Sequence, residues 1–534
     1  MGIPSYFAHI LKKYPRIIKS LHQLLVIDNL YMDCNGIIYE VVRQMTYDSD
    51  SCAEFEKELI ENVCKSINNC IEMVNPINRV FIAFDGVAPV AKLNQQRERR
   101  FKSWYLSHME SDKRKMMIKE GIKVNAPKAC WNTTAITPGT NFMTELHKML
   151  HEKYKNMDNV IVSSSKEPGE GEHKIFEYIR KFEKEHSKQT TLIYGMDADL
   201  IMLCLSHLNI SEKIYLYRET PEYLKSINVK LDVNEKYYVD IPEFANEIAK
   251  QLTKLELSVN EKHTKVLDYI FMCFMLGNDF MPHFPMLNIR TTGISTLMET
   301  YCATFKLKEG IIQACENGLK INWLQYKKFV QNLALQELTL IRKEHNTRDR
   351  QSRYMRDNED PENVMHDVMM LPMIEREVEM YINPFKNGWE KRYYSELCAV
   401  SNVDSLNELC RNYLEGMEWT FKYYTTGCVD WTWSYNNHYP PLLKDLETHI
   451  PEETIDLLKV KPKDPISELV QLCYVLPEQN YSLLPCNVSR CLKKIVSSKE
   501  PTFKWAYCKF FWECHTDLPK LNINEIITVI SKIK

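Results

Sequence analysis

The sequence predicts an α/β fold, in which a mostly parallel central sheet is flanked by helices and followed by a second, helix-rich block. Short apolar runs rich in β-branched and aromatic residues alternate with longer helical patterns, as in βαβ units. Three of the four clearest runs carry aspartates at or near their carboxyl ends. Farther along, beyond a charged stretch, the composition becomes rich in tryptophan and tyrosine. These observations favour one sheet with polar residues gathered at one edge.

The first two expected strands come early in the chain. One lies within the apolar run 24–38, which contains Asp33 and precedes a helical pattern over 53–74. The other is the run 79–84, which ends abruptly at Asp85, as a buried parallel strand would. Asp28, inside the first run, is interpreted as a structural residue.

Two further runs behave in the same way. The third expected strand covers 159–163, and the fourth covers 191–195, directly before Asp197 and Asp199. Ligands of open parallel sheets bind beyond the carboxyl ends of the strands. We therefore expect the aspartates that follow these strands to converge in space.

A chain of 534 residues is longer than one hydrophobic core usually organises, so about two to four domains are expected. The stretch from Arg342 to Glu362 is dense in charge and is interpreted as a mobile linker or a surface helix. The predicted division is therefore a first block over 1–340, a charged linker over 341–380 and a second block over 381–534. The segment 450–534 is expected to brace the rest.

Composition narrows the class of protein. The net charge is −3, so any site for a polyanion must be local. The 17 cysteines form no Cys-x-x-Cys pair and are scattered through apolar stretches, which favours reduced core thiols in an intracellular protein. We see no signal peptide, and the longest nearly apolar segment, 266–276, is about half of the ~20 residues that a membrane span needs. A soluble chain is expected.

Seven carboxylates occur in short polar motifs at the ends of apolar runs: Asp33, Asp85, Glu170, Glu172, Asp197, Asp199 and Asp279. In an extended backbone, residues two apart share a face, so each Asp-x-Asp or Glu-x-Glu pair would point the same way. So many anions in one cleft repel one another unless cations compensate them. Oxygen ligands without a Cys/His cluster suit Mg²⁺ or Mn²⁺. This constellation is what two-metal phosphodiester hydrolysis needs.

A basic helix face follows Asp85 directly. Pro89 opens a helical pattern in which four residues fall at i, i+4, i+7 and i+8, on one face: Lys92, Gln96, Arg99 and Arg100. Spacing alone fits a solvated face equally well, but the neighbouring Asp85 favours a phosphate pocket. A terminal phosphate with two charges would be held more strongly than an internal phosphodiester.

These motifs resemble those of the 5′→3′ exoribonucleases, especially the cytoplasmic branch. The resemblance covers residues 1 to about 445. The segments that carry it are Met1–Phe7, Asp28–Ile38, Phe84–Pro89, Lys92–Arg97, Ile136–Thr140, Pro168–Lys174, Tyr194–Leu200, Gly277–Phe280, Pro282–His283, Trp389–Tyr394, Tyr413–Trp419, Trp431–Tyr435 and His438–Pro440.

The resemblance implies a PIN/flap-nuclease-like core whose seven carboxylates bind two Mg²⁺ or Mn²⁺ ions. It implies that Lys92, Gln96, Arg99 and Arg100 hold a 5′-monophosphate, with no room for a cap or triphosphate. It also implies stacking of the 5′ nucleotides between two rings. The first ring is commonly histidine in the family but is Tyr39 here, and the second is Trp431 or Trp433, between which the sequence does not choose.

The function so implied is processive 5′→3′ hydrolysis of uncapped, 5′-monophosphorylated single-stranded RNA to mononucleotides, in mRNA decay. A cytoplasmic monomer is expected, with decapping machinery as a partner and no membrane contact. Composition would fit a viral protein or an AT-rich unicellular parasite. Two alternatives stay open: a structure-specific flap endonuclease with similar chemistry, and a catalytically silent RNA-binding protein.

Overall fold

The fold is built around a seven-stranded sheet. The computed structural model describes residues 5–48, 51–126, 129–218, 231–232, 235–253, 257–306, 309–316, 318–355, 360, 362–459, 464–496 and 500–533. The strand order is β1-β7-β6-β5-β2-β3-β4. The strands are β1 (Ile18–Ser20), β2 (Asn29–Asp33), β3 (Arg79–Ala83), β4 (Val160–Ser163), β5 (Thr191–Tyr194), β6 (Ile214–Tyr217) and β7 (Tyr237–Asp240). Four of them match the four strands expected from the sequence.

Parallel pairing dominates this sheet. β2 pairs in parallel with β3 on one side and β5 on the other, and β4 and β6 extend the parallel region outward. Only β7 runs antiparallel to its neighbours β6 and β1. The register sets Asp33 opposite Ala83 and Met32 opposite Tyr194, so β2, β3 and β5 end at one level. The predicted fold class is confirmed.

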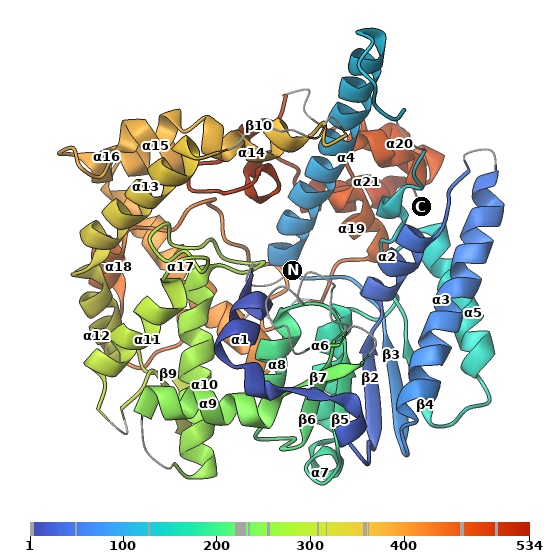
Figure 1. Cartoon of the computed structure of the whole chain (residues 1–534), viewed down its shortest axis with the longest axis horizontal. Helices are drawn as coiled ribbons and strands as arrows, with labels where there is room; N and C mark the ends of the chain where they lie inside the picture. Colours follow the sequence, from blue (N-terminus) through green and yellow to red (C-terminus); the bar gives the residue numbers. More distant parts are fainter. Residues whose placement is uncertain are drawn as a thin grey trace.

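Helices cover both faces of the sheet (Figure 1). Leu30 and Met32 pack in one cluster with α2 (Asn35–Gln44), α3 (Cys52–Val74) and α5 (Asn141–Tyr154). Tyr31, which points to the opposite face, packs in a second cluster with α6 (Gly171–Lys181), α8 (Asp199–Ser206), α9 (Ile241–Thr253) and α10 (Val259–Cys273). Alternate strand residues therefore serve two cores, as expected of a buried parallel sheet.

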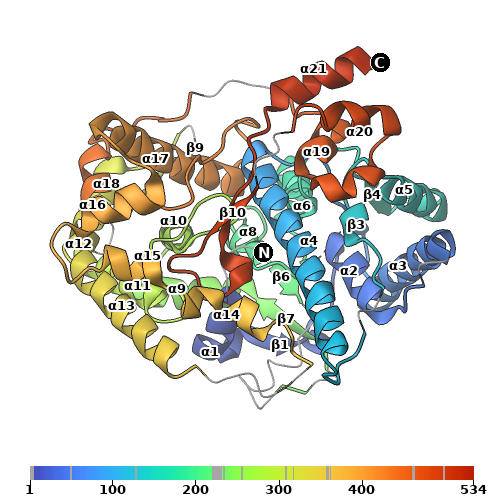
Figure 2. The ribbon, with the colours of Figure 1, turned by 90° about the horizontal axis from the view of Figure 1, so that it is seen from above.

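A helical region that extends on both sides of the predicted boundary at residue 340 lies on the α9–α10 side of the sheet, in yellow and orange in Figures 1 and 2. Its helices are α11 (Gly293–Thr304), α12 (Trp323–Ala334), α13 (Glu337–Arg353), α14 (His366–Ile374), α15 (Glu377–Ile382), α16 (Trp389–Tyr393), α17 (Val403–Thr425) and α18 (Leu443–His449). A short hairpin of β8 (Ile312–Cys315) and β9 (Gly318–Ile321) lies among them.

The charged stretch expected to form a linker is helical over much of its described part. Residues 342–353 belong to α13, while 356–359 and 361 lie outside the described residues. Arg348 is buried and forms a 2.6 Å ion pair with the buried Glu379 of α15. This arrangement is the helical alternative of the two interpretations, with one face packed rather than solvated. The division into blocks at 340 and 380 stays a prediction.

The C-terminal segment packs against a long helix, α4 (Val90–Lys119), as Figure 2 shows. α19 (Glu468–Val475), α20 (Cys486–Leu492) and α21 (Ile523–Ile533) share a core with Ala88, just before α4, and with Leu93, in the first turn of α4. A further hairpin, β10 (Thr502–Lys504) with β11 (His515–Asp517), lies in the same segment. Among the described helices, none combines the length and apolar character needed to cross a bilayer.

Candidate active site

The predicted carboxylates gather at the carboxyl edge of the sheet. Asp33 is the last residue of β2, Asp85 is the second residue after β3, and Asp197 is the third after β5. Because these strands are parallel and in register, their ends lie side by side. Ligand atoms of Asp33, Glu172 and Asp197 all lie within 4.8 Å of one another. The expected convergence is therefore observed for residues more than 130 positions apart in the chain.

Neither carboxylate pair lies in the extended backbone in which its two side chains would share a face. A helix begins inside each of the Glu170–Glu172 and Asp197–Asp199 pairs. Glu170 is the N-cap of α6, and Asp199 is the first residue of α8. Helix N-termini carry partial positive charge, which favours carboxylates there. The pairs are thus placed by helix starts rather than by strand alternation.

Gly171 makes the close approach at this edge possible. A Cβ on Gly171 would lie 2.7 Å from Asp33 Oδ1, a distance that real Cβ atoms essentially never show. Its backbone N–H donates a 2.7 Å hydrogen bond to Asp85 Oδ1. The glycine between the two glutamates therefore lets the start of α6 contact both aspartates.

Two oxygens at the centre of the cluster suit a cation. Asp33 Oδ1 and Glu172 Oε2 are buried and accept no hydrogen bond from the described residues. Buried carboxylate oxygens are normally paired, and leaving one unpaired is costly. All-oxygen donor sets of this kind suit Mg²⁺ or Mn²⁺. The residues therefore fit a divalent cation bound among Asp33, Glu172 and Asp197.

Burial and mutual repulsion raise the proton affinity of the cluster. Burial raises the pKa of Asp33 well above its ordinary value, and Asp85 and Asp197 add to the rise. The pKa of Glu172 is raised in the same way by burial and by Asp199. Burial and then Asp279 raise the pKa of Asp199 to about 7. A bound cation would reverse these shifts, since it favours the ionised carboxylates.

Lys92 supplies part of the missing positive charge. Its Nζ lies 2.5 Å from Glu170 Oε1 and donates a 2.7 Å hydrogen bond to Asp279 Oδ2. Although burial opposes ionisation of Asp279, Lys92 holds the pKa of that carboxyl below its usual range. Gln95 Nε2 donates to Asp279 Oδ1 at 3.3 Å. Lys92 is therefore an internal counter-ion, with two of its three N–H donors directed at carboxylates.

Three residues that the sequence analysis did not single out also contact the cluster. Asn35 donates from Nδ2 to Asp85 Oδ2, and its Oδ1 accepts the backbone N–H of Asp85 at 3.3 Å. Tyr423 of α17 donates its hydroxyl to Glu170 Oε2 at 2.9 Å. His173 stacks on the Tyr423 ring with centroids 3.7 Å apart. The helix-rich block thus contributes to the site through a tyrosine that an aromatic-rich composition alone did not distinguish.

The rest of the basic face of α4 lies beside the carboxylates. Gln96 is buried, and its Oε1 accepts a 3.3 Å hydrogen bond from Arg100 Nη1. Burial lowers the pKa of Arg100 to about 10, and Tyr39 and Asp85 are among the groups whose charges act on it. Arg99 is half-buried, and its charge acts on Asp279. Gln96 and Arg100 are therefore in contact, and Arg100 and Arg99 are near Asp85 and Asp279 respectively.

The aromatic candidates differ in exposure. Tyr39, in α2, is half-buried and close enough to Arg100 for their charges to interact. Trp433 is buried and stacks on Trp419 with centroids 5.2 Å apart. Trp431 is half-buried, and its carbonyl oxygen accepts the backbone N–H of Val90 at 3.0 Å, at the start of α4. Trp433 is thus part of an aromatic core, whereas Trp431 keeps exposed ring surface beside α4.

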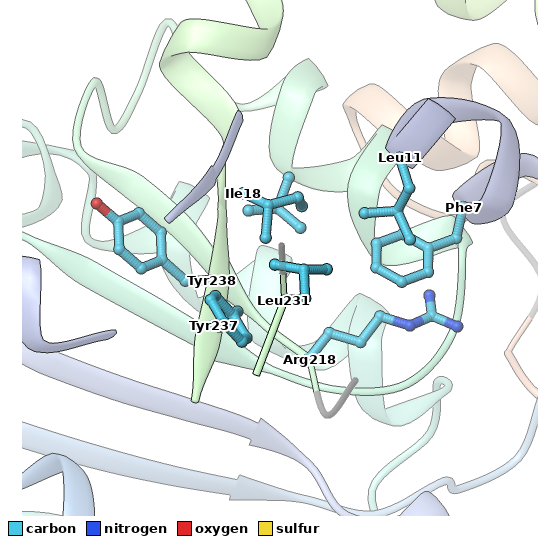
Figure 3. Close-up of a pocket in the computed structure, with 8 residues that line it drawn as sticks. Phe7, Leu11, Ile18, Arg218, Leu231, Tyr237 and Tyr238 are labelled. Atoms are coloured by element: carbon cyan, nitrogen blue, oxygen red, sulfur yellow. The ribbon is translucent and has the colours of Figure 1, made fainter. Parts of the chain in front are cut away.

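A separate hollow lies at the far end of the sheet, next to β1 and β7 (Figure 3). Arg218, which follows β6, places its guanidinium over the Phe7 ring at 4.3 Å. The other lining residues are Leu11, Ile18, Leu231, Tyr237, Tyr238 and Val239. Among the described residues, its lining contains no carboxylate, so we assign it no part in the acidic site.

The topology of the sheet and the carboxylates at its edge together indicate an α/β protein of the nuclease type. Comparison with known families identifies the class of nuclease more specifically. Residues 1–220 match the N-terminal domain of the XRN 5′-3′ exonucleases, and residues 261–380 and 375–511 match the Xrn1 helical domain. The chain therefore belongs to the 5′-3′ exoribonuclease family, as the sequence motifs predicted.

Individual relatives agree with this assignment. The chain is 28% identical to human 5′-3′ exoribonuclease 1 and 26% identical to its namesake from Saccharomyces cerevisiae. It is also 26% identical to 5′-3′ exoribonuclease 2 of Arabidopsis thaliana. These alignments cover 94%, 91% and 94% of this chain but only 32%, 40% and 63% of the relatives. The chain thus spans between about a third and two thirds of the length of these relatives.

Proposed function

We propose that this protein is a metal-dependent 5′→3′ exoribonuclease that degrades uncapped, 5′-monophosphorylated RNA processively to 5′-mononucleotides. The observation that carries the proposal is the group formed by Asp33, Glu172 and Asp197, whose ligand atoms lie within 4.8 Å of one another. It lies inside the segment that matches the exonuclease N-terminal domain. Membership of this family supports RNA as the substrate. The buried oxygens of Asp33 and Glu172 that accept no hydrogen bond from the described residues support metal dependence.

Two Mg²⁺ or Mn²⁺ ions are the proposed cofactors. Asp33, Asp85, Glu170, Glu172, Asp197, Asp199 and Asp279 would hold them. Such ions, when bound, activate water and neutralise charge that develops on the leaving oxygen. Lys92 holds Glu170 and Asp279 in place, and Tyr423 fixes the second oxygen of Glu170. These contacts keep the carboxylates oriented while RNA moves through the site.

The 5′-phosphate is assigned to Gln96, Arg99 and Arg100, with Lys92 at the boundary between this pocket and the carboxylates. Guanidinium groups bind phosphate through paired, charge-assisted hydrogen bonds. Arg100 is half-buried and partly desolvated, so an anion beside it would relieve the cost of its desolvation. A pocket built from one helix face beside Asp85 places the first phosphodiester near the carboxylates.

Stacking on Tyr39 and Trp431 would hold the 5′ nucleotides without reading their bases. Base–aromatic stacking contributes about 1–3 kcal/mol per base and tolerates any sequence. The half-buried rings of Tyr39 and Trp431 are suited to this role, whereas the buried ring of Trp433 is stacked on Trp419. We propose a monomer that acts in cytoplasmic mRNA decay after a decapping machinery exposes the 5′-monophosphate.

The test uses one RNA with a 5′-monophosphate, a 5′-triphosphate or a cap, labelled at either end and incubated with Mg²⁺ or chelator. We expect mononucleotides to appear first from the 5′ label, only with Mg²⁺ and only from the monophosphate. Asp199→Asn should bind this RNA without degrading it. Internal fragments, or indifference to the 5′ group, would indicate an endonuclease. Binding without turnover under every condition would indicate a silent RNA-binding protein.

A further inference from the structure

A second group of metal-ligating side chains lies outside the acidic cluster. Glu98 is on α4, His438 follows the Trp431–Trp433 segment, and His515 is the first residue of β11. One ligand atom from each of these three residues lies within 4.8 Å of those of the other two. All three are half-buried. Residues more than 400 positions apart in the chain are thus brought together at one point.

The surroundings already orient two of the three side chains. His438 Nε2 lies 2.9 Å from Asp517 Oδ1, while its Nδ1 faces Glu98 Oε1 at 3.9 Å. The backbone N–H of Thr516 donates to Glu98 Oε2 at 3.2 Å. A carboxylate that holds one ring nitrogen of a histidine, leaving the other for an ion, is the usual outer shell of a metal-bound imidazole. Asp517 and Thr516 therefore leave His438 Nδ1 and Glu98 Oε1 directed at each other.

The charges around the group are compatible with a cation. Lys102 Nζ donates to the carbonyl oxygens of Trp512 and Cys514, and Lys504 Nζ pairs with Asp517 at 3.4 Å. Burial lowers the pKa of His515 well below its ordinary value, so its imidazole is neutral and can offer a lone pair. Burial also raises the pKa of Glu98, because its charge is only partly compensated.

The group must close to hold an ion. The rings of His438 and His515 stack with centroids 4.9 Å apart and planes 25° from parallel. Zinc–nitrogen bonds of about 2.0–2.1 Å in a tetrahedral site place ligand atoms roughly 3.3 Å apart. The ligand atoms, which lie within 4.8 Å of one another, would have to approach to about this spacing when an ion binds.

We propose that Glu98, His438 and His515 form a binding site for a divalent transition-metal ion of the zinc type, with water in a fourth position. Two imidazoles and one carboxylate select such an ion over Mg²⁺. The ion would join α4, the segment after Trp433 and β11. Glu98 lies on α4 between Gln96 and Arg99, so this ion would fix the helix that carries the proposed phosphate pocket. The proposal does not depend on exonuclease activity.

The test measures Zn²⁺ binding to the whole chain by competition with a chromogenic chelator, with millimolar Mg²⁺ present to occupy the acidic cluster. Variants are Glu98→Gln, His515→Gln and Asp517→Asn, with Glu110→Gln on the same helix and Asp199→Asn in the acidic cluster as controls. Circular dichroism and thermal melting confirm that each variant is folded. X-ray absorption of the zinc-loaded protein identifies the ligands.

We expect one Zn²⁺ per wild-type chain, with imidazole scattering in the absorption spectrum and a higher melting temperature than without zinc. Binding should weaken at least about 100-fold in Glu98→Gln and His515→Gln and about 10- to 100-fold in Asp517→Asn. Both controls should bind as the wild type does. If no stoichiometric Zn²⁺ binds, His438 serves only to connect Glu98 and Asp517, and the proposal fails. It also fails if the ligand variants bind normally or if Asp199→Asn abolishes binding.

Discussion

Lys92 Nζ lies 2.7 Å from Asp279 Oδ2, so the residue expected to hold substrate phosphate is bound to a carboxylate of the proposed metal site. The same ammonium lies 2.5 Å from Glu170 Oε1. Lys92 comes from the start of α4, whereas Asp279 follows α10, so this contact joins the two proposed sites. The proposed phosphate pocket and the carboxylates therefore share one charged residue and respond together to its removal.

Replacing Lys92 should destabilise the metal-free protein. Lys92→Met leaves Glu170 and Asp279 buried without their partner, and breaking a buried pair in this way costs about 3–5 kcal/mol. Chemical unfolding in chelator should show this loss, and Mg²⁺ should recover part of it. The control is Lys115→Met on the exposed end of α4, where little change is expected. An unchanged free energy of unfolding in Lys92→Met would contradict the counter-ion role.

The metal-free protein should lose stability as pH rises. The pKa of Asp199 is about 7 in the folded protein and about 3.9 in an unfolded chain. Between these two pKa values the folded state binds more protons than the unfolded state. The contribution of Asp199 to the free energy of unfolding is therefore greatest below about pH 4 and falls as the pH rises to about 7. Melting temperatures from pH 5 to pH 8 in chelator test this. Saturating Mg²⁺ should flatten the slope, and Asp199→Asn should reduce it. An equal slope in the variant would argue against Asp199 as its source.

Arg100 should determine the preference for RNA with a 5′-monophosphate over RNA with other 5′ groups. Arg100→Ala removes a charge-assisted contact worth about 1.5–3 kcal/mol, so KM for monophosphorylated RNA should rise about 10- to 100-fold. Degradation of 5′-hydroxyl RNA should change little. Arg114→Ala, on the same helix but paired with Glu362, serves as the control. If Arg100→Ala discriminated between the 5′ ends as the wild type does, Arg100 would not be part of the phosphate pocket.

Variants of Trp431 and Trp433 should distinguish a role in RNA stacking from a role in protein stability. Trp433→Ala opens the aromatic core beside Trp419 and should cost about 3–5 kcal/mol of stability. Trp431→Ala should leave the melting temperature nearly unchanged but weaken binding of single-stranded RNA by about 1–3 kcal/mol. Unfolding curves and RNA titrations of both variants decide the assignment. The reverse pattern would make Trp433 the stacking residue.

The C-terminal segment should brace α4. Gln471 Oε1 accepts the backbone N–H of Ala88 at 2.9 Å, and Arg97 Nη2 donates to the carbonyl oxygen of Pro519 at 2.6 Å. A chain that ends at residue 450 should therefore melt at a lower temperature. Leu472→Ala, at a fully buried position, should cost about 2–5 kcal/mol, whereas Ile527→Ala, 41% exposed, should cost little. Unchanged melting of the shortened chain would exclude bracing.

Much of the sheet and its edge could be predicted because the signals are local. The apolar run before Asp85 predicts a strand that ends there, and the structure ends β3 at Ala83. The helix of Asp199 was not predicted, because a short Asp-x-Asp motif is compatible with a strand end and with a helix start. The burial of Arg348 could not be predicted from the sequence either. A charge-rich helix whose buried contact is an ion pair shows no periodic pattern of apolar residues.

The family, the fold class and the carboxylates at the ends of the parallel strands could all be predicted from the amino-acid sequence. They depend on patterns within a few residues and on the fixed direction of parallel strands. The folded structure was needed to show that Lys92 neutralises Asp279, that Tyr423 supports Glu170 and that Trp433 belongs to a core. The same holds for the meeting of Glu98, His438 and His515. Most of these contacts join residues far apart in the chain, and neither periodicity nor spacing encodes which distant side chains will meet.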